Sequence, residues 1–122
     1  MLTGCLIAES LRSGAALDGM QLVVTRIRRE DAGDVSVGQP LTWTFTDFEA
    51  AERHAEALAG ALSVALDEAL GWYCDFRSPE ETFVVFAGHV FRYPRGDRAG
   101  RARAEAHARA PGVPGVQLDW PE

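Results

Sequence analysis

The chain has 122 residues, of which 47% are apolar, and this balance suits a globular domain with its own core and argues against a disordered or membrane-embedded chain. Its 18 acidic residues outnumber 12 basic ones, and the formal charge of −6 argues against nonspecific nucleic-acid binding, which depends on neutralising phosphates. All twelve of those basic residues are arginine, which indicates a bacterial, GC-rich genome.

The two cysteines and the lack of a long apolar run favour a cytoplasmic location. Cys5 and Cys74 lie far apart within apolar stretches, which is typical of reduced, buried thiols rather than a disulfide framework. No segment approaches the ~20 apolar residues that a membrane-spanning helix needs. We therefore expect a cytoplasmic protein that does not bind membranes.

Three strands are expected in the first third of the chain. Residues 2–12 are predicted to form the first strand, and the Asp18-Gly19 pair predicts a hairpin turn into a second strand over 20–29. Residues 30–40 are polar and contain glycine and proline, which is typical of a loop. In 41–46, threonine alternates with larger apolar residues, so this segment is predicted as a strand with one wet face.

A long helix is expected next. Thr46-Asp47-Phe48-Glu49 fits a capping box, and Gly71 is suited to end a helix in the left-handed conformation. Apolar residues recur between them at spacings of three and four, which predicts one buried stripe. At ~1.5 Å per residue this helix would be about 34 Å long.

The span from Trp72 to Tyr93 contains two strand-like runs that are apolar on both faces, around a turn at Pro79-Glu80. This turn predicts a register in which Phe76 opposes Phe83 and Cys74 opposes Val85, below the long helix. A strand that is apolar on both faces is covered on both sides. The cover of the second side is expected to be more of this protein, a second copy of it, or a ligand.

The C-terminal part is rich in alanine and arginine. It is predicted to form an exposed helix over Asp97–Arg109, with a stripe made only of alanine, and Pro111 is expected to end it. Spaced apolar residues then predict an extended strap that packs on the domain through Val113, Val116, Leu118 and Trp120.

Candidate binding residues gather on the second face of the Trp72–Tyr93 pair. Asp75, Arg77 and Arg92 are expected to form a charged cluster there, either as a site for an anionic or polar group or as a cross-strand ion pair. The predicted ligand- or partner-binding residues are Tyr73, Asp75, Arg77, Phe86, Arg92 and Tyr93.

His89 is the candidate for a catalytic residue. It follows Gly88, which leaves room for a ligand to approach, and histidine can act as a general base near neutral pH. A structural histidine at the sheet margin is the favoured alternative, because no triad is evident to orient the ring. No metal-ligand spacing or cofactor motif is present, so we expect neither a metal nor a cofactor.

Together these patterns predict an α+β fold: an antiparallel five-stranded sheet, in the chain order β-β-β-α-β-β-α, with one long helix across one face. We expect a single domain over 1–122, with sheet and helix in 1–95 and the second helix and strap in 96–122. The expected function is a non-catalytic binding module that pairs with another protein or forms a homodimer through an apolar sheet face or edge. The alternative is a small-molecule-binding protein or small enzyme, with an apolar or anionic ligand in a cavity between sheet and helix that is lined by His89, Asp75, Tyr93 and Arg92.

Overall fold

The computed structural model describes residues 1–33, 35, 37–109 and 118–122. Within these ranges, six strands form one antiparallel sheet in the order β2-β3-β1-β4-β5-β6. The predicted α+β class with an antiparallel sheet is confirmed, and the sheet has one strand more than predicted. The elements are β1 (Leu2–Ile7), η1 (Ala8–Ser10), β2 (Val23–Asp31), β3 (Thr42–Ala50), η2 (Glu52–His54), α1 (Ala55–Ala65), η3 (Ala69–Gly71), β4 (Tyr73–Arg77), β5 (Glu81–Phe86), β6 (His89–Pro94) and α2 (Arg98–Arg109).

The sixth strand arises because the segment expected as one strand over 83–93 is a hairpin. Ala87 and Gly88 form a two-residue turn between β5 and β6, which places His89 directly opposite Phe86. Gly88 has a φ of +76°, which glycine adopts without steric cost and which such tight turns require. As a result of this turn, each side chain of β6 lies on the sheet face opposite the one expected for a continuous strand.

The prediction of a hairpin between the first two strands is wrong. β1 lies at the centre of the sheet, where β3 pairs with one edge and β4 with the other, so β2 is separated from it. The connection between β1 and β2 instead packs on the core through Leu11, Leu17, Met20 and Leu22. Because these apolar residues pack on the core, the connection runs along the surface of the core instead of forming a tight turn at Asp18-Gly19.

The long helix is shorter than predicted at both ends. The expected capping box lies inside β3, where Phe48 pairs with Gly4 of β1 and with Val24 of β2, and pairing on both edges overrides the local helix signal. At the other end, the backbone N–H of Arg12 donates to the Ala65 carbonyl, and the N–H of Asp67 to the Ser10 carbonyl. These bonds to the segment after β1 take the place of another helical turn, so α1 has 11 residues.

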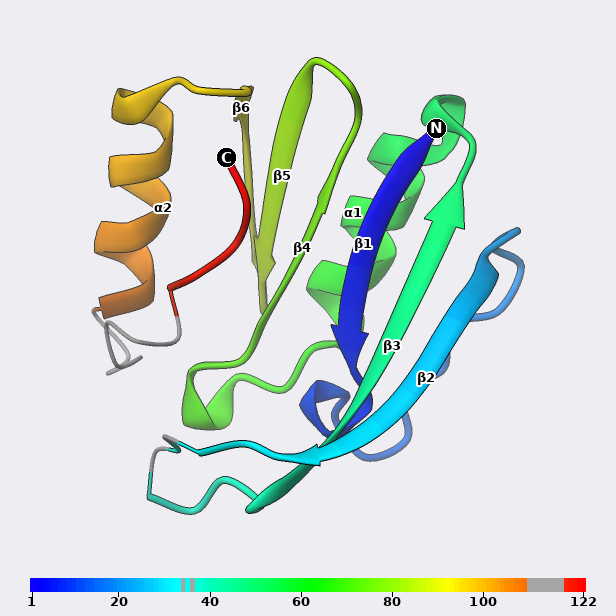
Figure 1. Cartoon of the computed structure of the whole chain (residues 1–122), viewed down its shortest axis with the longest axis vertical. Coiled ribbons are helices and arrows are strands. Elements are labelled where there is room, and N and C mark those ends of the chain that lie inside the picture. The colour runs from blue at the N-terminus through cyan, green and yellow to red at the C-terminus, as the bar shows by residue number, and fades with distance from the viewer. Residues whose placement is uncertain (34, 36, 110–117) are drawn as a thin grey trace.

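The main core lies between α1 and the sheet (Figure 1). The predicted register is confirmed, since Phe76 opposes Phe83 and Cys74 opposes Val85. The rings of Phe76 and Phe83 stack with their centres 4.6 Å apart. The rest of this core comes from β1, β3 and the apolar stripe of α1, through Leu2, Leu6, Phe48, Leu58, Leu62 and Leu66.

A second core covers the other face of β4, β5 and β6. α2 packs there through its small residues, and the C-terminal residues 118–122 run between α2 and the strands (Figure 1). The second helix is confirmed, although it packs on the sheet rather than standing free. The buried residues of this second core are Val84, Phe86, Tyr93, Ala104, Ala108, Leu118 and Trp120.

Arginines hold the C-terminal strap in place. The guanidinium of Arg101 donates to the carbonyl oxygens of Trp120 and Leu118 at 2.8 and 3.1 Å, and it lies 4.6 Å from the centre of the Trp120 ring. Leu118 and Trp120 of the predicted strap are buried in the core below α2, whereas Pro111, Val113 and Val116 lie outside the described residues.

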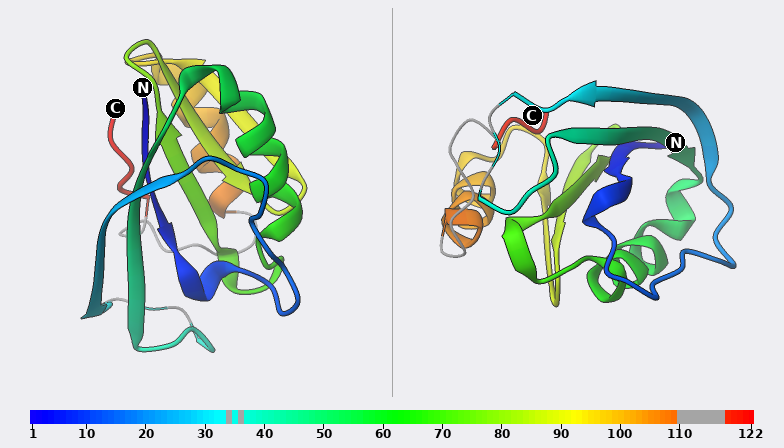
Figure 2. Two further views of the ribbon diagram at one scale, coloured as in Figure 1. Left: turned by 90° about the vertical axis from the view of Figure 1, so that its right-hand side faces the viewer. Right: turned by 90° about the horizontal axis from the view of Figure 1, so that it is seen from below.

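The two helices and the strap leave one part of the sheet uncovered. α1 covers one face, and α2 and the strap cover the β4–β6 half of the other (Figure 2). β2 has a bulge at Thr25, and bulges bend a strand and increase its twist. The uncovered region therefore lies on the face opposite α1, between this bent edge strand and the C-terminal strap.

Candidate functional site

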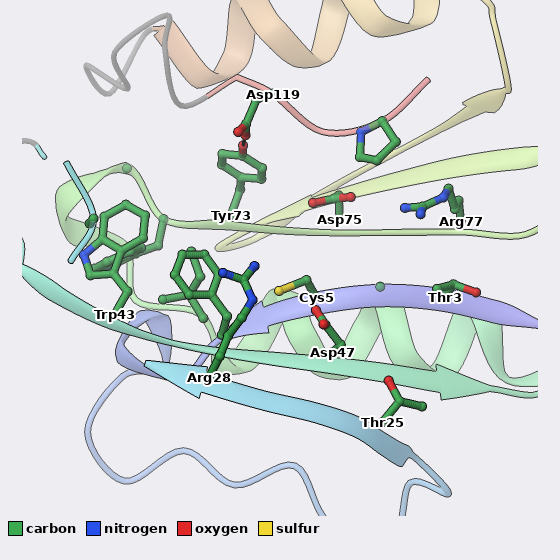
Figure 3. A pocket seen from close by; sticks show the side chains of 17 residues that line it. Thr3, Cys5, Thr25, Arg28, Trp43, Asp47, Tyr73, Asp75, Arg77 and Asp119 are labelled. Carbon is green, nitrogen blue, oxygen red and sulfur yellow. Dashed lines mark hydrogen bonds between the residues drawn. The ribbon is translucent and has the colours of Figure 1, made fainter. Parts of the chain in front are cut away.

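A cavity of about 660 Å³ opens on this uncovered part of the sheet (Figure 3). We call it the sheet trough. Its floor is the face of β1 that points away from α1, and its walls are β2 and β3 on one side and β4, η3 and the C-terminal strap on the other. The part of the second face that α2 leaves free is thus hollow rather than flat.

Two carboxylates and a thiol form a row across the middle of the trough. Asp47 of β3 and Asp75 of β4 are both direct cross-strand partners of Cys5 of β1, so the three side chains share one face. Because neighbouring strands lie ~4.8 Å apart, the backbones that carry the two aspartates are about 10 Å apart. Figure 3 shows Asp47 directed toward Cys5, with Asp75 on the far side of β1.

Aromatic rings line the end of the trough near η3. Trp43 packs edge-on against Trp72, with ring centres 5.0 Å apart, and lies 6.1 Å from Phe45. The guanidinium of Arg28 lies 4.2 Å from the centre of the Phe45 ring and forms an ion pair of 2.6 Å with Glu30. Its Nε is buried and has no hydrogen-bond partner among the described residues. This end of the trough already holds one cation on an aromatic face.

Asp75 is a half-buried carboxylate whose charge is poorly compensated. Burial raises its pKa from 3.8 to about 6; the nearby Arg77 lowers this pKa without outweighing the loss of water, and the charge of Asp119 adds to the rise. In the part of the chain that the structure describes, no arginine lies within ion-pairing distance of it. At neutral pH the trough therefore contains a carboxylate whose charge is not neutralised by a direct ion pair with any described arginine.

The Cys5 thiol stays protonated at neutral pH. Burial, a hydrogen bond to Asp47 and the charges of Asp47 and Asp75 raise its pKa to about 12. The thiolate is the nucleophilic form of cysteine, so this environment disfavours nucleophilic catalysis by Cys5. Cys74 points to the core on the other side of the sheet, and its thiol donates to the Cys5 carbonyl oxygen at 3.4 Å.

Three of the six predicted binding residues line the trough: Tyr73, Asp75 and Arg77. They alternate on β4 with core residues, which is why they reach the same face. The Tyr73 hydroxyl donates a hydrogen bond of 3.4 Å to Asp119 of the strap, and burial raises the pKa of Tyr73. The strap thereby contributes a third carboxylate to the trough wall.

The other predicted binding residues lie elsewhere. Phe86 and Tyr93 are buried below α2, where the Tyr93 oxygen accepts a hydrogen bond of 2.7 Å from the indole of Trp120. Arg92 lies on the α1 side of the sheet, paired with Glu81 at 2.7 Å and with Glu56 of α1 at 3.2 Å. The predicted charged cluster of Asp75, Arg77 and Arg92 does not form, because the hairpin between β5 and β6 turns Arg92 away.

His89 faces α2 rather than the trough. Its ring centre lies 4.4 Å from that of His107, and both imidazoles pack near Phe91. Burial, and then the proximity of His89, lowers the pKa of His107. Of the four residues expected to line a cavity, Asp75 alone lines the trough, and the trough lies on the opposite side of the sheet from α1.

Sequence reasoning missed the residues that come from outside β4. The alternation over 41–46 correctly places Trp43 and Phe45 on one face, but only the pairing of β3 with β1 brings that face beside Asp75. The capping-box pattern predicts that Asp47 lies at the start of a helix, whereas Asp47 lies in strand β3. The trough residues missed in this way are Cys5, Arg28, Trp43, Phe45, Asp47 and Asp119.

The described residues offer neither a metal site nor a membrane-spanning helix. They contain no group of three or more His, Cys, Asp or Glu side chains arranged to hold a metal ion. No helix within them is long and apolar enough to cross a membrane. No protein-family model, no curated protein and no solved structure matches this chain.

Proposed function

We propose that this protein is a non-catalytic binding module and that the sheet trough is its binding site. The observation that carries the proposal is a cavity of about 660 Å³ with both aromatic and charged walls. Small-molecule sites typically occupy about 300–1,000 Å³ and combine apolar surface with a few polar anchors. A protonated Cys5 and the location of His89 under α2 favour binding over catalysis.

The elements around the trough support this role because they hold its side chains rigidly. β1, β3 and β4 are held on both edges by neighbouring strands, and their opposite faces pack against the α1 core. Sites on such elements keep their geometry better than sites on loops. The expected ligand is therefore one that fits a preformed trough.

A fragment screen by NMR tests the proposal. We expect neutral or charged fragments to shift the backbone amide signals of β1, β3 and β4, and binding to quench the fluorescence of Trp43 and Trp72 in the wall. Arg77→Ala should weaken the binding of those fragments that touch Arg77. Arg92→Ala is the matched control, since Arg92 lies on the next-but-one strand and on the opposite face. A screen in which no fragment shifts the trough signals would refute the proposal.

Self-association through the edge strand β2 is a second candidate function. β2 ends the sheet, so one edge of its backbone has no partner strand among the described residues. Its apolar side chains are unusually exposed, with Val23, Val24 and Ile27 at 62%, 51% and 65%. Exposed edge strands of this kind favour pairing with another chain.

Sedimentation equilibrium tests this second candidate. If a homodimer forms through β2, Ile27→Lys should shift the chain toward the monomer, because a charge would be buried in the contact. Val64→Lys is the control, because Val64 is equally exposed, at 66%, but lies on α1. A wild-type chain that stays monomeric at millimolar concentration would rule out self-association.

A further inference from the structure

We propose that the sheet trough binds small organic cations, in which an ammonium or guanidinium group is carried on an apolar body. This inference rests on the proposed binding function and specifies the chemical class of the ligand. It joins three features of the trough: its charge, its aromatic wall and its dimensions.

The charge balance of the trough favours a cation. Asp47, Asp75 and Asp119 supply three carboxylates to its walls, against the guanidinium groups of Arg28 and Arg77. None of the three carboxylates is within ion-pairing distance of an arginine in the described ranges, whereas Arg28 is already paired with Glu30 at 2.6 Å. Negative charge thus exceeds positive charge at the centre of the trough.

The aromatic wall supplies the other half of the recognition. The Arg28 guanidinium already lies over the Phe45 ring, 4.2 Å from its centre, so this wall offers a ligand apolar surface rather than a free cation site. The apolar body of a ligand that packs against these rings is removed from water, which favours binding. Trp43 extends this wall from the same strand, at 6.1 Å from Phe45.

The dimensions suit a small body. The row from Asp47 to Asp75 spans about 10 Å across three strands. A ligand in the cavity of about 660 Å³ could place its charged group at this row and its apolar part toward Trp43 and Phe45. The raised pKa of Asp75 adds a condition, because the carboxylate must be ionised to attract a cation. Binding should therefore weaken as the pH falls below about 6.

Phenethylamine is a suitable probe, because 2-phenylethanol and phenylacetate present the same ring with a neutral and an anionic group. Each is titrated into the wild-type chain at pH 7.5, and the shifts of the trough amides are followed by NMR. We expect the amine to bind at least tenfold more tightly than the alcohol, which corresponds to ~1.4 kcal/mol, because a hydrogen bond between an ammonium group and a carboxylate is stronger than one between neutral groups. Asp75→Asn should remove about this tenfold preference, and a titration at pH 5 should reduce it in the wild type.

Two further variants complete the test. Asp47→Asn changes the other carboxylate of the row and serves if Asp75→Asn fails to fold. Asp18→Asn, in an exposed loop outside the trough, should leave amine binding unchanged. Equal binding of amine and alcohol, or tighter binding of phenylacetate, would overturn the cation inference and leave the trough a binding site. The failure of every fragment to reach the trough would instead overturn the binding function itself.

Discussion

Asp75 holds its charge at a position that water reaches poorly, and this destabilises the folded state at neutral pH. Its pKa of about 6 in the folded protein exceeds the ordinary value of 3.8, so the folded chain binds this proton more tightly than the unfolded chain does. The corresponding contribution to stability is fully present below pH 3.8 and is lost as the pH rises through 6. A residue that reduces stability in this way is typical of a binding site.

Replacing Asp75 should therefore make the protein more stable. We expect Asp75→Asn to raise the free energy of unfolding at pH 7.5 by on the order of 2 kcal/mol, because one pKa unit corresponds to ~1.4 kcal/mol. At pH 4.5 most of this gain should disappear, since the wild-type carboxyl is then protonated in the folded protein. Urea unfolding at the two pH values measures both effects, with Asp18→Asn as the exposed control. An Asp75→Asn protein less stable than the wild type at pH 7.5 would contradict the argument.

Gly4 permits the close approach of the strands that form the trough floor. A Cβ atom at this position would lie 2.6 Å from the Phe48 ring and 2.8 Å from the carbonyl oxygen of Asp75. We expect Gly4→Ala to lower the free energy of unfolding by ~1–3 kcal/mol, as overpacked cores do. Gly60→Ala in α1 is the matched control, because a Cβ there meets no atom within 4 Å. It should stabilise the helix by ~0.5–1 kcal/mol, and a similar gain at Gly4 would show that the strands can separate.

At the scale of elements, α1 shows what periodicity can predict. The three- and four-residue spacing correctly identifies the buried face, since Leu58, Leu62 and Leu66 are each 1% exposed. The ends of the helix depend on partners far away in the sequence. The start of α1 is fixed because β3, which precedes it, pairs with a strand on each side. The end of α1 is fixed by backbone hydrogen bonds to the segment after β1.

The buried face of α1 gives a direct prediction of stability. Leu62→Ala should lower the free energy of unfolding by ~2–5 kcal/mol, because it leaves a cavity in the main core. Val64→Ala, two residues further along the same helix and 66% exposed, should change it by less than ~0.5 kcal/mol. Denaturant titration of the two variants provides the comparison. A cost below ~0.5 kcal/mol for Leu62→Ala would mean that the core is not packed as described.

The hairpin that was wrongly predicted at Asp18-Gly19 and the hairpin that was missed at Ala87-Gly88 have a related cause. Asp18-Gly19 has the composition of a tight turn but lies in a connection whose apolar residues pack on the core. Ala87-Gly88 lacks that composition and yet forms the turn between β5 and β6, where the Gly88 N–H donates to the Ser63 carbonyl of α1. Contacts with the rest of the protein determine the conformation of both segments, so the local turn composition does not predict it.

For the whole molecule, the sequence predicts the need for cover but not its source. The apolar pattern of Val84 and Phe86 correctly indicates a second covered face, which α2 and the strap provide. Half of the predicted binding residues reach the trough because they alternate along β4. The remaining trough residues come from strands whose order in the sheet is set by long-range pairing, which no local pattern encodes.

The two cores should unfold together. β5 contributes Phe83 and Val85 to the α1 core, and Val84 and Phe86 to the core below α2, so neither can lose its packing alone. We expect one cooperative transition, with the same midpoint by circular dichroism and by tryptophan fluorescence. Trp120→Phe should lower both midpoints together, although it changes only the core below α2. Separate midpoints for the two probes would show that α2 and the strap form an independent unit.

The setting of Cys5 also bears on how long the site stays intact. Peroxides and alkylating reagents attack the thiolate, and the burial of Cys5, together with the carboxylates beside it, keeps that form scarce. Among the described residues that line the trough, Cys5 supplies the only sulfur atom, and its burial and the neighbouring carboxylates together protect it from oxidation and alkylation. A chain that is exposed to oxidants can in this way keep the floor of the trough chemically unmodified while it retains the cysteine.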